Sequence, residues 1–320
     1  MKFEQSIKKM YNKFSNNFSN FGQILFFIAL LLVLIVFFKS IEKYSLGNKE
    51  GMTSKNKNND KIVFKEGYDV YDDFYSDIYD YLIYSGVKNN FEISNIIKNT
   101  KPDEKSIIAD IGCGTGHQVK ALAQKGFNIT GVDISRSMIN KAKEHFPEGN
   151  FIVGNALDNT LFKMNSLTHI LCLYFSIYYM KDKRHFFDNC MDWLMPGGYL
   201  VLHLVERETF DPILPPGNPL YIVSPQKYAK ERITKTKITF NDYVYNANFN
   251  LDKDSDIATF DEKFKFNDGK VRKQQQKLYM EDTATIFNIA QDCGFISAGK
   301  IHMVKCAYES QYLYIFTKPS

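Results

Sequence analysis

The first strong hydrophobic feature of the chain is an uninterrupted apolar segment near its start. Residues 24–38 are fifteen apolar residues in a row, and the three uncharged residues before them extend the segment to eighteen. A helix of that length rises about 27 Å, just enough for a bilayer core of about 30 Å. No cleavage site typical of a signal peptide follows, and a helix of a soluble core would carry a polar face. The pattern predicts a transmembrane helix over 21–39, preceded by a basic tail at 1–20 and followed by a flexible polar linker at 40–65.

From about residue 66 the hydrophobic pattern becomes periodic. Aromatic residues at helical spacing predict a helix over 69–85, and a second helix is expected over 90–98. Short apolar runs then alternate with amphipathic stretches. The predicted strands cover 106–110, 128–133, 150–155, 169–173 and 199–205, and the helices between them cover 117–125, 137–145 and 183–194. This alternation predicts an α/β fold with a doubly wound, mostly parallel sheet that is covered on both faces.

The alternation stops after the fifth strand. Residues 206–280 contain apolar positions in β-type patterns and an Asn267-Asp268-Gly269 hairpin signal, so they are predicted to form an antiparallel insertion. A helix over 282–293 and two strands over 299–304 and 311–317 follow, which makes seven strands in the main sheet. The predicted folded domain therefore runs over 66–320.

Charge and cysteine content exclude several classes of protein. The net charge of +4 divides unevenly, because residues 1–65 carry +7 and the rest carries −3. A mildly acidic domain is a poor nucleic-acid binder, since neutralising phosphates needs a basic surface, and we expect no nucleic-acid partner. The five cysteines are scattered, without a C-x-x-C or Cys/His cluster. Neither a disulfide scaffold nor a metal site is expected, and a reducing compartment is favoured.

The segment with the clearest chemical meaning is IIADIGCGTG at 107–116. An apolar strand ends at Asp110, glycines follow at every second position, and a helix begins. Glycines there let backbone amides approach a ligand, and a helix N-terminus favours a carboxylate or phosphate. The next strand ends in Asp133, an acid suited to a ribose diol. The G-x-G-x-G spacing differs from the G-x-G-x-x-G of dinucleotide sites, which disfavours a nicotinamide-dependent oxidoreductase.

This segment resembles the cofactor loop of class I S-adenosylmethionine-dependent methyltransferases, and the resemblance extends over roughly 66–320. It implies that S-adenosylmethionine is the cofactor and that the domain has the Rossmann-like methyltransferase fold. Asp110 and the loop would hold the methionine part, Asp133 the ribose, and residues 134, 138, 155 and 156 the adenine. The implied cofactor-binding residues are Asp110, Gly112, Cys113, Gly114, Gly116, Asp133, Ile134, Met138, Asn155, Ala156 and Leu173.

The acceptor side is marked by tyrosines rather than by an obvious catalytic motif. No N/D-P-P-Y motif follows the fourth strand, so an amino methyltransferase of nucleic acids is not indicated. The segment 173–180 is rich in tyrosine, and the helix over 69–85 resembles the lid helix of small-molecule methyltransferases. Alternatively, these tyrosines form an aromatic core stripe, and His203 is either a general base or a hydrogen-bonded core residue. The candidate catalytic residues are Tyr71, Tyr75, Tyr174, Tyr178 and His203.

The combined features predict a membrane-anchored methyltransferase that acts on a small-molecule or lipid-like acceptor. The alternative is a membrane-tethered scaffold that keeps the fold without methyl transfer. Residues 40–320 are expected in the cytoplasm, where S-adenosylmethionine is made and unpaired cysteines stay reduced. Lysines flank both sides of 21–39, so the positive-inside rule does not decide the orientation.

Overall fold

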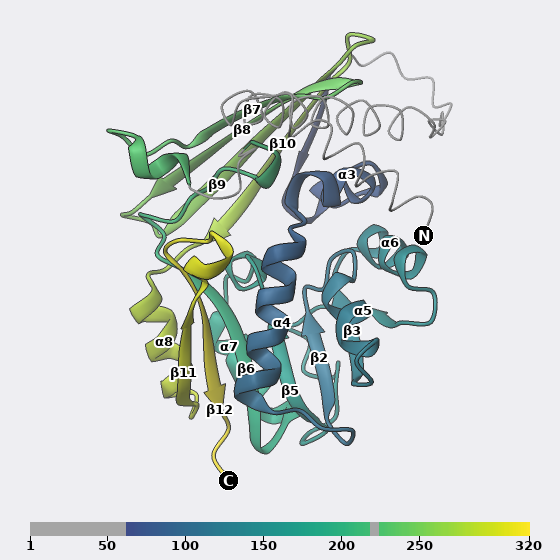
Figure 1. Cartoon of the computed structure of the whole chain (residues 1–320), viewed down its shortest axis with the longest axis vertical. Coiled ribbons are helices and arrows are strands. Elements are labelled where there is room, and N and C mark those ends of the chain that lie inside the picture. The colour runs from purple at the N-terminus through teal and green to yellow at the C-terminus, as the bar shows by residue number, and fades with distance from the viewer. Residues whose placement is uncertain (1–61, 218–223) are drawn as a thin grey trace, which may run out of the picture. The chain divides into compact units, whose positions relative to one another are not determined.

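The computed structural model describes residues 62–217 and 224–320 (Figure 1). The predicted basic tail, transmembrane helix and nearly all of the predicted linker lie outside the described residues. Within the described part of the chain, no helix combines the length and the apolar character that crossing a bilayer needs. All described elements belong to one compact unit that spans residues 60–320.

The main sheet has seven strands in the spatial order β11-β12-β6-β5-β2-β3-β4. The five strands from β2 to β6 run parallel, and β12 lies antiparallel between β6 and β11. The strands are β2 (Ile107–Ile111), β3 (Asn128–Asp133), β4 (Asn150–Val153), β5 (Leu167–Cys172), β6 (Leu194–Val205), β11 (Ile296–His302) and β12 (Gln311–Thr317). The predicted mostly parallel α/β sheet is confirmed.

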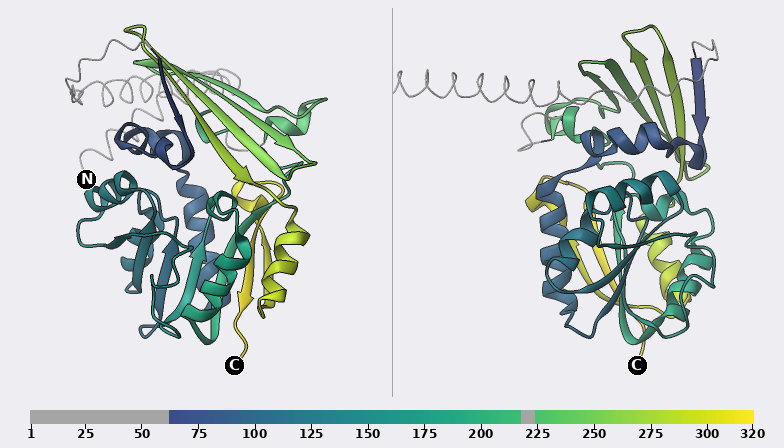
Figure 2. Two further views of the ribbon diagram at one scale, coloured as in Figure 1. Left: turned by 180° about the vertical axis from the view of Figure 1, so that it is seen from behind. Right: turned by 90° about the vertical axis from the view of Figure 1, so that its right-hand side faces the viewer.

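Helices cover both faces of this sheet, as the continuous apolar strands require (Figure 2). Successive residues of a strand pack on opposite faces. Ala109 and Ile170 share a buried cluster with α7 and α8, whereas Ile108 and Leu171 share another with α4, α5 and α6. The helices are α4 (Gly86–Thr100), α5 (His117–Ala123), α6 (Arg136–His145), α7 (Lys183–Trp193) and α8 (Thr283–Asp292).

A second sheet of five strands is built mainly from the predicted insertion. Its order is β1-β10-β9-β8-β7, antiparallel except for β1, which runs parallel to β10. The strands are β1 (Ile62–Glu66), β7 (Lys235–Thr239), β8 (Tyr243–Asp252), β9 (Ile257–Phe266) and β10 (Val271–Tyr279). The antiparallel insertion was predicted, but β1 was not. Residues 62–65 were assigned to the linker because this edge strand is mostly exposed and lacks an alternating apolar pattern.

The predicted helix over 69–85 is divided in the structure. A 3₁₀ turn, η1 (Gly67–Val70), precedes α3 (Asp73–Ile83), whose N-cap Asp72 accepts a hydrogen bond from the Tyr75 amide. Arg272 of β10 fixes this break, because its guanidinium donates to the Asp72 carboxylate at 2.8 Å and to the Val70 carbonyl at 3.0 Å. The helix α3 then lies between the two sheets (Figure 1). The remaining 3₁₀ turns are η2 (Ser176–Tyr179), η3 (Pro215–Gly217), η4 (Pro225–Tyr228) and η5 (Met303–Cys306).

Candidate functional site

A cavity of about 520 Å³ lies at the carboxyl ends of β2, β3 and β5. That edge of an open α/β sheet is where ligands bind, and the volume falls in the range of small-molecule sites. The loop after β2 forms one end. The helix α3, the segment 210–215 and the strands β8 to β10 complete the walls. The insertion therefore contributes directly to the cavity.

The loop after β2 can be built only with glycine at two positions that line or support the cavity. Gly112 and Gly116 have φ values of 72° and 82°, a region that residues with a side chain rarely adopt. A Cβ atom at Gly112 would clash with the Ser176 hydroxyl, and one at Gly116 would lie 2.8 Å from the Phe151 ring. Together with Cys113 and Gly114, this loop brings its backbone to the cavity wall.

Asp133 is oriented by the glycine loop. One carboxylate oxygen accepts a hydrogen bond from the Gly114 amide at 2.9 Å, and the other accepts one from the Ser135 amide at 2.9 Å. Burial raises the pKa of Asp133, and these two hydrogen bonds act in the opposite direction. Each oxygen keeps a lone pair, so the carboxylate is positioned to accept hydrogen bonds from a diol at the cavity wall.

Asp110 is a buried acid that faces the cavity; the positive charge of Lys88 acts on it, but no cation of the described residues forms an ion pair with it. Its side chain is 2% exposed, and Oδ2 has no hydrogen-bond partner within residues 62–217 and 224–320. Burial raises the pKa of Asp110 to about 8, and the nearby charges of Glu92 and Asp133 add to this effect. A cationic or hydrogen-donating ligand group beside Asp110 would relieve the cost of this buried carboxylate.

A buried cation that the sequence pattern does not indicate lies at the same end of the cavity. Lys88 of α4 is 5% exposed and lines the cavity. Its ammonium lies 3.1 Å from Glu92 Oε2 and 4.8 Å from the centre of the Tyr174 ring. Since an ammonium has three donors, Lys88 can bind an anionic ligand group while keeping its ion pair. The spacing of Lys88 and Glu92 in the sequence does not indicate a buried site, because it is the same as that of an ordinary i,i+4 ion pair on a helix surface.

His203 lies behind this ion pair and does not line the cavity. Its side chain is fully buried, with Nε2 2.9 Å from Gln311 Oε1 and Nδ1 3.3 Å from Glu92 Oε1. Burial raises the pKa of Glu92, but the charges and hydrogen bonds of Lys88 and His203 outweigh this and hold it below its usual value. The structure therefore favours the core-histidine alternative over a general base in contact with substrate.

The other predicted cofactor residues line the cavity near Asp133. Ile134 and Asn155 are exposed at its rim, and Met138 is buried with 1% exposure. The Asn155 side-chain oxygen accepts a hydrogen bond from the Leu157 amide at 3.0 Å, which orders the turn after β4. The structure places every predicted cofactor residue, except Gly116, on the cavity lining: Asp110, Gly112, Cys113, Gly114, Asp133, Ile134, Met138, Asn155, Ala156 and Leu173. Gly116 supports the loop from the side that packs on α6.

The predicted acceptor tyrosines separate into two groups. Tyr71, Tyr75 and Tyr174 line the cavity. Tyr178 does not, because it is fully buried and its hydroxyl accepts a hydrogen bond from the Val205 amide at 2.8 Å. The next residue, Tyr179, lines the cavity instead. The structure thus places Tyr178, which we predicted in the acceptor pocket, in the core, where it ties η2 to the end of β6.

A hydrogen-bond network joins these tyrosines to the second sheet. The Tyr71 hydroxyl donates to the Tyr179 oxygen at 2.7 Å, and Tyr179 donates to the side-chain oxygen of Gln276. The Gln276 amide nitrogen donates to Glu262 at 2.6 Å. Glu262 also accepts hydrogen bonds from Tyr75 at 3.0 Å and from two residues of its own sheet. Burial raises the pKa of Glu262, and these donors act to lower it.

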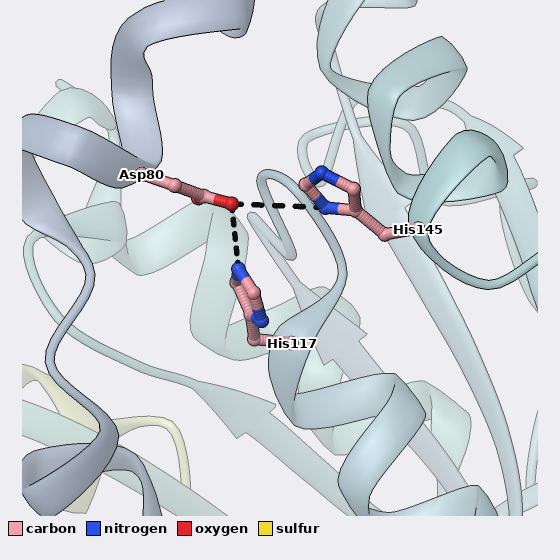
Figure 3. Close-up of side chains that lie close together, drawn as sticks. All are labelled: Asp80, His117 and His145. Atoms are coloured by element: carbon pink, nitrogen blue, oxygen red, sulfur yellow. Dashed lines mark hydrogen bonds and ion pairs between the residues drawn. The ribbon is translucent and has the colours of Figure 1, made fainter. Parts of the chain in front are cut away.

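A second network joins α3 to the glycine loop (Figure 3). Asp80 accepts a hydrogen bond from the Thr115 hydroxyl at 2.6 Å and lies 2.7 Å from His117 Nε2. Burial acts to raise the pKa of Asp80, but the contacts from His117 and Thr115 outweigh it and hold the pKa below its usual value. The Tyr84 ring stacks on His117 with centroids 3.9 Å apart. His117 thus links the lid helix to the cofactor loop in addition to opening α5.

A comparison with known protein families shows what the main sheet and its glycine loop resemble. Residues 108–198 match a family model described as a methyltransferase domain. This segment of the chain therefore resembles a methyltransferase domain. The glycine loop and Asp133, which led us to expect the S-adenosylmethionine-dependent class, lie within the matched residues.

Individual relatives agree with this assignment over part of the chain. A trans-aconitate 2-methyltransferase from Delftia acidovorans is 28% identical over 102 residues, which are 31% of this chain and 38% of that protein. A ubiquinone biosynthesis O-methyltransferase from Rickettsia canadensis is 27% identical over 123 residues, 38% of this chain and 52% of that protein. The chain thus spans between two fifths and about half of the length of these curated relatives.

A solved structure agrees over a longer stretch. An S-adenosylmethionine-dependent methyltransferase from Clostridium acetobutylicum superimposes with a TM-score of 0.57 at 14% identity, covering 77% of this chain and 97% of that one. At this level of identity the likeness establishes the Rossmann-like methyltransferase fold of the described unit.

Proposed function

We propose that this protein transfers a methyl group from S-adenosylmethionine to a small-molecule acceptor. The observation that carries the proposal is the continuity of one cavity. It joins the buried acids and glycine loop of a cofactor site to a chamber lined by aromatic side chains. Cofactor and acceptor can therefore meet in a common space from which most solvent is excluded.

The charges at the loop end of the cavity match the polar groups of the cofactor. S-adenosylmethionine carries an ammonium and a carboxylate on its methionine part and a diol on its ribose. Asp110 Oδ2 has no hydrogen-bond partner among the described residues, and Lys88 has donors to spare beside Glu92. We assign the ammonium to Asp110, the carboxylate to Lys88 and the diol to Asp133. This pairing gives each charged group an opposite charge or a charge-assisted hydrogen bond.

Methyl transfer requires alignment more than covalent help. The acceptor lone pair forms a bond to the methyl carbon while the carbon–sulfur bond breaks, and the electron pair of that bond stays on sulfur as a neutral thioether. Holding the acceptor in line with that bond supplies much of the rate enhancement. The absence of a catalytic triad around the described cavity is therefore compatible with activity, and a proton is removed only from an acceptor that arrives protonated.

The opposite end of the cavity favours a compact acceptor. Four phenylalanines line this end, from the turn after β5 to the second sheet: Phe175, Phe210, Phe249 and Phe260. Tyr174 lies between them and Lys88. The cavity of about 520 Å³ has to hold both the cofactor and the acceptor. A small metabolite or the headgroup of a lipid fits this space, whereas a folded polymer does not.

We further propose that residues 21–39 anchor the protein in a membrane once, with the methyltransferase domain in the cytoplasm. Support comes from the apolar run at 24–38 and from the free state of all five cysteines, which suits a reducing compartment. Protease protection in sealed membrane vesicles tests the orientation. Protection of the domain from added protease would reverse the proposed topology, and release of the chain by alkaline washing would remove the anchor.

The methyl-transfer proposal is tested on the full chain purified in mild detergent. It is incubated with S-adenosylmethionine labelled in the methyl group and with fractionated pools of small metabolites and lipids. We expect label in a compact product, and we expect Asp133→Ala to reduce it. Tight cofactor binding without transfer to any fraction would instead support the alternative of an inactive, membrane-tethered scaffold.

A further inference from the structure

We propose that Asp80, His117 and His145 form a binding site for a divalent transition-metal ion such as Zn²⁺. The three side chains come from α3, the start of α5 and the end of α6, and their ligand atoms all lie within 4.8 Å of one another. Figure 3 shows both imidazole rings pointing toward the same carboxylate oxygen of Asp80. Asp80 and His117 also line the cavity, and the proposal does not depend on the methyl-transfer proposal.

The spacing of the ligand atoms suits a metal ion after small side-chain movements. Ligands about 2.0–2.2 Å from an ion lie about 3.0–3.6 Å apart at the angles that tetrahedral and octahedral sites use. Asp80 Oδ2 lies 2.7 Å from His117 Nε2 and 3.7 Å from His145 Nδ1. One distance is slightly short, the other is slightly long, and the two imidazole nitrogens lie within 4.8 Å of each other, so shifts of about 1 Å would bring the three atoms around one ion.

The surroundings of the cluster supply what a metal site needs beyond three ligands. The Thr115 carbonyl oxygen lies 3.1 Å from His145 Nδ1 and is a possible fourth ligand. The Thr115 hydroxyl donates to the other Asp80 oxygen and leaves Oδ2 for the ion, and Tyr84 holds the His117 ring by stacking. Metal ligands in proteins are commonly oriented by such outer contacts.

The donor set selects the kind of ion. Two imidazoles and one carboxylate suit Zn²⁺, Co²⁺, Ni²⁺ or Fe²⁺, whereas Mg²⁺ and Ca²⁺ prefer oxygen ligands alone. The side chains of Asp80, His117 and His145 are 25%, 25% and 34% exposed, so a hydrated ion can reach them from solvent. A water molecule would then complete the coordination, as in sites with three protein ligands.

Metal binding at this place would tie the lid helix to the cofactor loop. Asp80 belongs to α3, whereas Thr115 and His117 belong to the loop and helix after β2. At present a few hydrogen bonds join them. An ion bound to both would hold α3 in the closed position over the cavity, so the apparent stability of the chain would increase with metal concentration.

The test uses the full chain, stripped of metal with a chelator, and the ions Zn²⁺, Co²⁺ and Mg²⁺ as probes. We expect calorimetry to give one Zn²⁺ site with micromolar or tighter affinity and no Mg²⁺ binding at millimolar concentration. Co²⁺ should produce visible d–d absorption bands. His117→Gln and His145→Gln should each weaken Zn²⁺ binding at least thirtyfold, whereas His185→Gln, a change at an exposed histidine of α7, should leave it unchanged.

Circular dichroism and a thermal melt without metal establish that each variant is folded. Should His117→Gln fail to fold because it loses the Asp80 contact, His145→Gln carries the test alone, since its contact to Asp80 is longer. Zn²⁺ affinity weaker than about 1 mM, or equal affinity in wild type and the folded cluster variants, would overturn the proposal.

Discussion

Binding of S-adenosylmethionine should release a proton from Asp110. This carboxyl is 2% exposed, and burial raises its pKa to about 8. At pH 7 a group with that pKa is about 90% protonated. A ligand ammonium placed beside it favours the charged carboxylate and lowers the pKa by about 1–3 units. The bound pKa is then about 5–7, which corresponds to release of about 0.4–0.9 proton for each cofactor bound.

Calorimetry at pH 7 in buffers of different ionisation enthalpy measures this number directly. The slope of the observed enthalpy against the buffer enthalpy gives the protons released. Asp110→Asn should reduce the slope to near zero, whereas Asp158→Asn, the same change at an exposed acid, should leave it as in wild type. A wild-type value below about 0.2 proton, or an unchanged slope in Asp110→Asn, would refute the assignment of Asp110 to the cofactor ammonium.

The same shift makes a prediction for the chain without cofactor. Because folding raises the pKa of Asp110 from its ordinary value of 3.8 to about 8, the folded chain binds an extra proton at pH values between these two. This contribution to stability is complete below the unfolded pKa and is lost as pH rises through about 8. Between pH 5 and pH 8.5 the melting temperature of wild type should fall more than that of Asp110→Asn. Equal slopes for the two chains would contradict the raised pKa.

Three further substitutions test the separate parts of the site. Asp133→Ala should weaken S-adenosylmethionine binding by about 1.5–3 kcal/mol in calorimetry, the value of hydrogen bonds to a charged group, and unchanged affinity would rule out its ribose role. Tyr174→Ala should lower methyl transfer at least tenfold with little change in cofactor affinity. Normal turnover would instead show that the acceptor binds away from Tyr174. Tyr178→Phe should leave transfer intact but lower the free energy of unfolding in urea by about 1–3 kcal/mol, because the buried Val205 amide loses its partner. Slower transfer with an unchanged free energy of unfolding would instead indicate that Tyr178 belongs to the acceptor pocket.

The parallel sheet could be predicted from the sequence because its strands are buried on both faces. The strand Asn128–Asp133 and the strand Gln311–Thr317 have the bounds that the apolar runs indicated. The strand β10 shows why the second sheet was harder to assign. Its inward-facing residues include Arg272, Gln274 and Gln276, which are all less than 10% exposed. A buried polar face has no alternating apolar pattern, so its role in the cavity could not be deduced from the sequence.

The cofactor side of the site was predictable because its residues are adjacent in the chain. Asp110 lies at the end of β2, the glycine loop follows it directly, and Asp133 ends the next strand, so the order of the elements fixes their positions. The acceptor side lacks this property. In a 3₁₀ turn, successive side chains point about 120° apart. Tyr178 therefore packs inward and Tyr179 faces the cavity, and no feature of the sequence distinguishes the two.

The contacts that hold α3 in place show both what the sequence could predict and what it could not. Near its start, α3 is joined to the second sheet by Tyr75 and Glu262, and near its end to the glycine loop by Asp80. All three are polar residues that meet partners more than thirty residues away in the chain. The apolar spacing of α3 predicts that it is a helix but gives no information about these partners. Opening the cavity at α3 requires these hydrogen bonds to be exchanged for water, and it also requires Tyr75 and Leu82 to leave the buried apolar cluster that α3 shares with the second sheet. Hydrogen bonds and apolar packing therefore act together to hold α3 over the cavity, and the sequence pattern reveals only the apolar part.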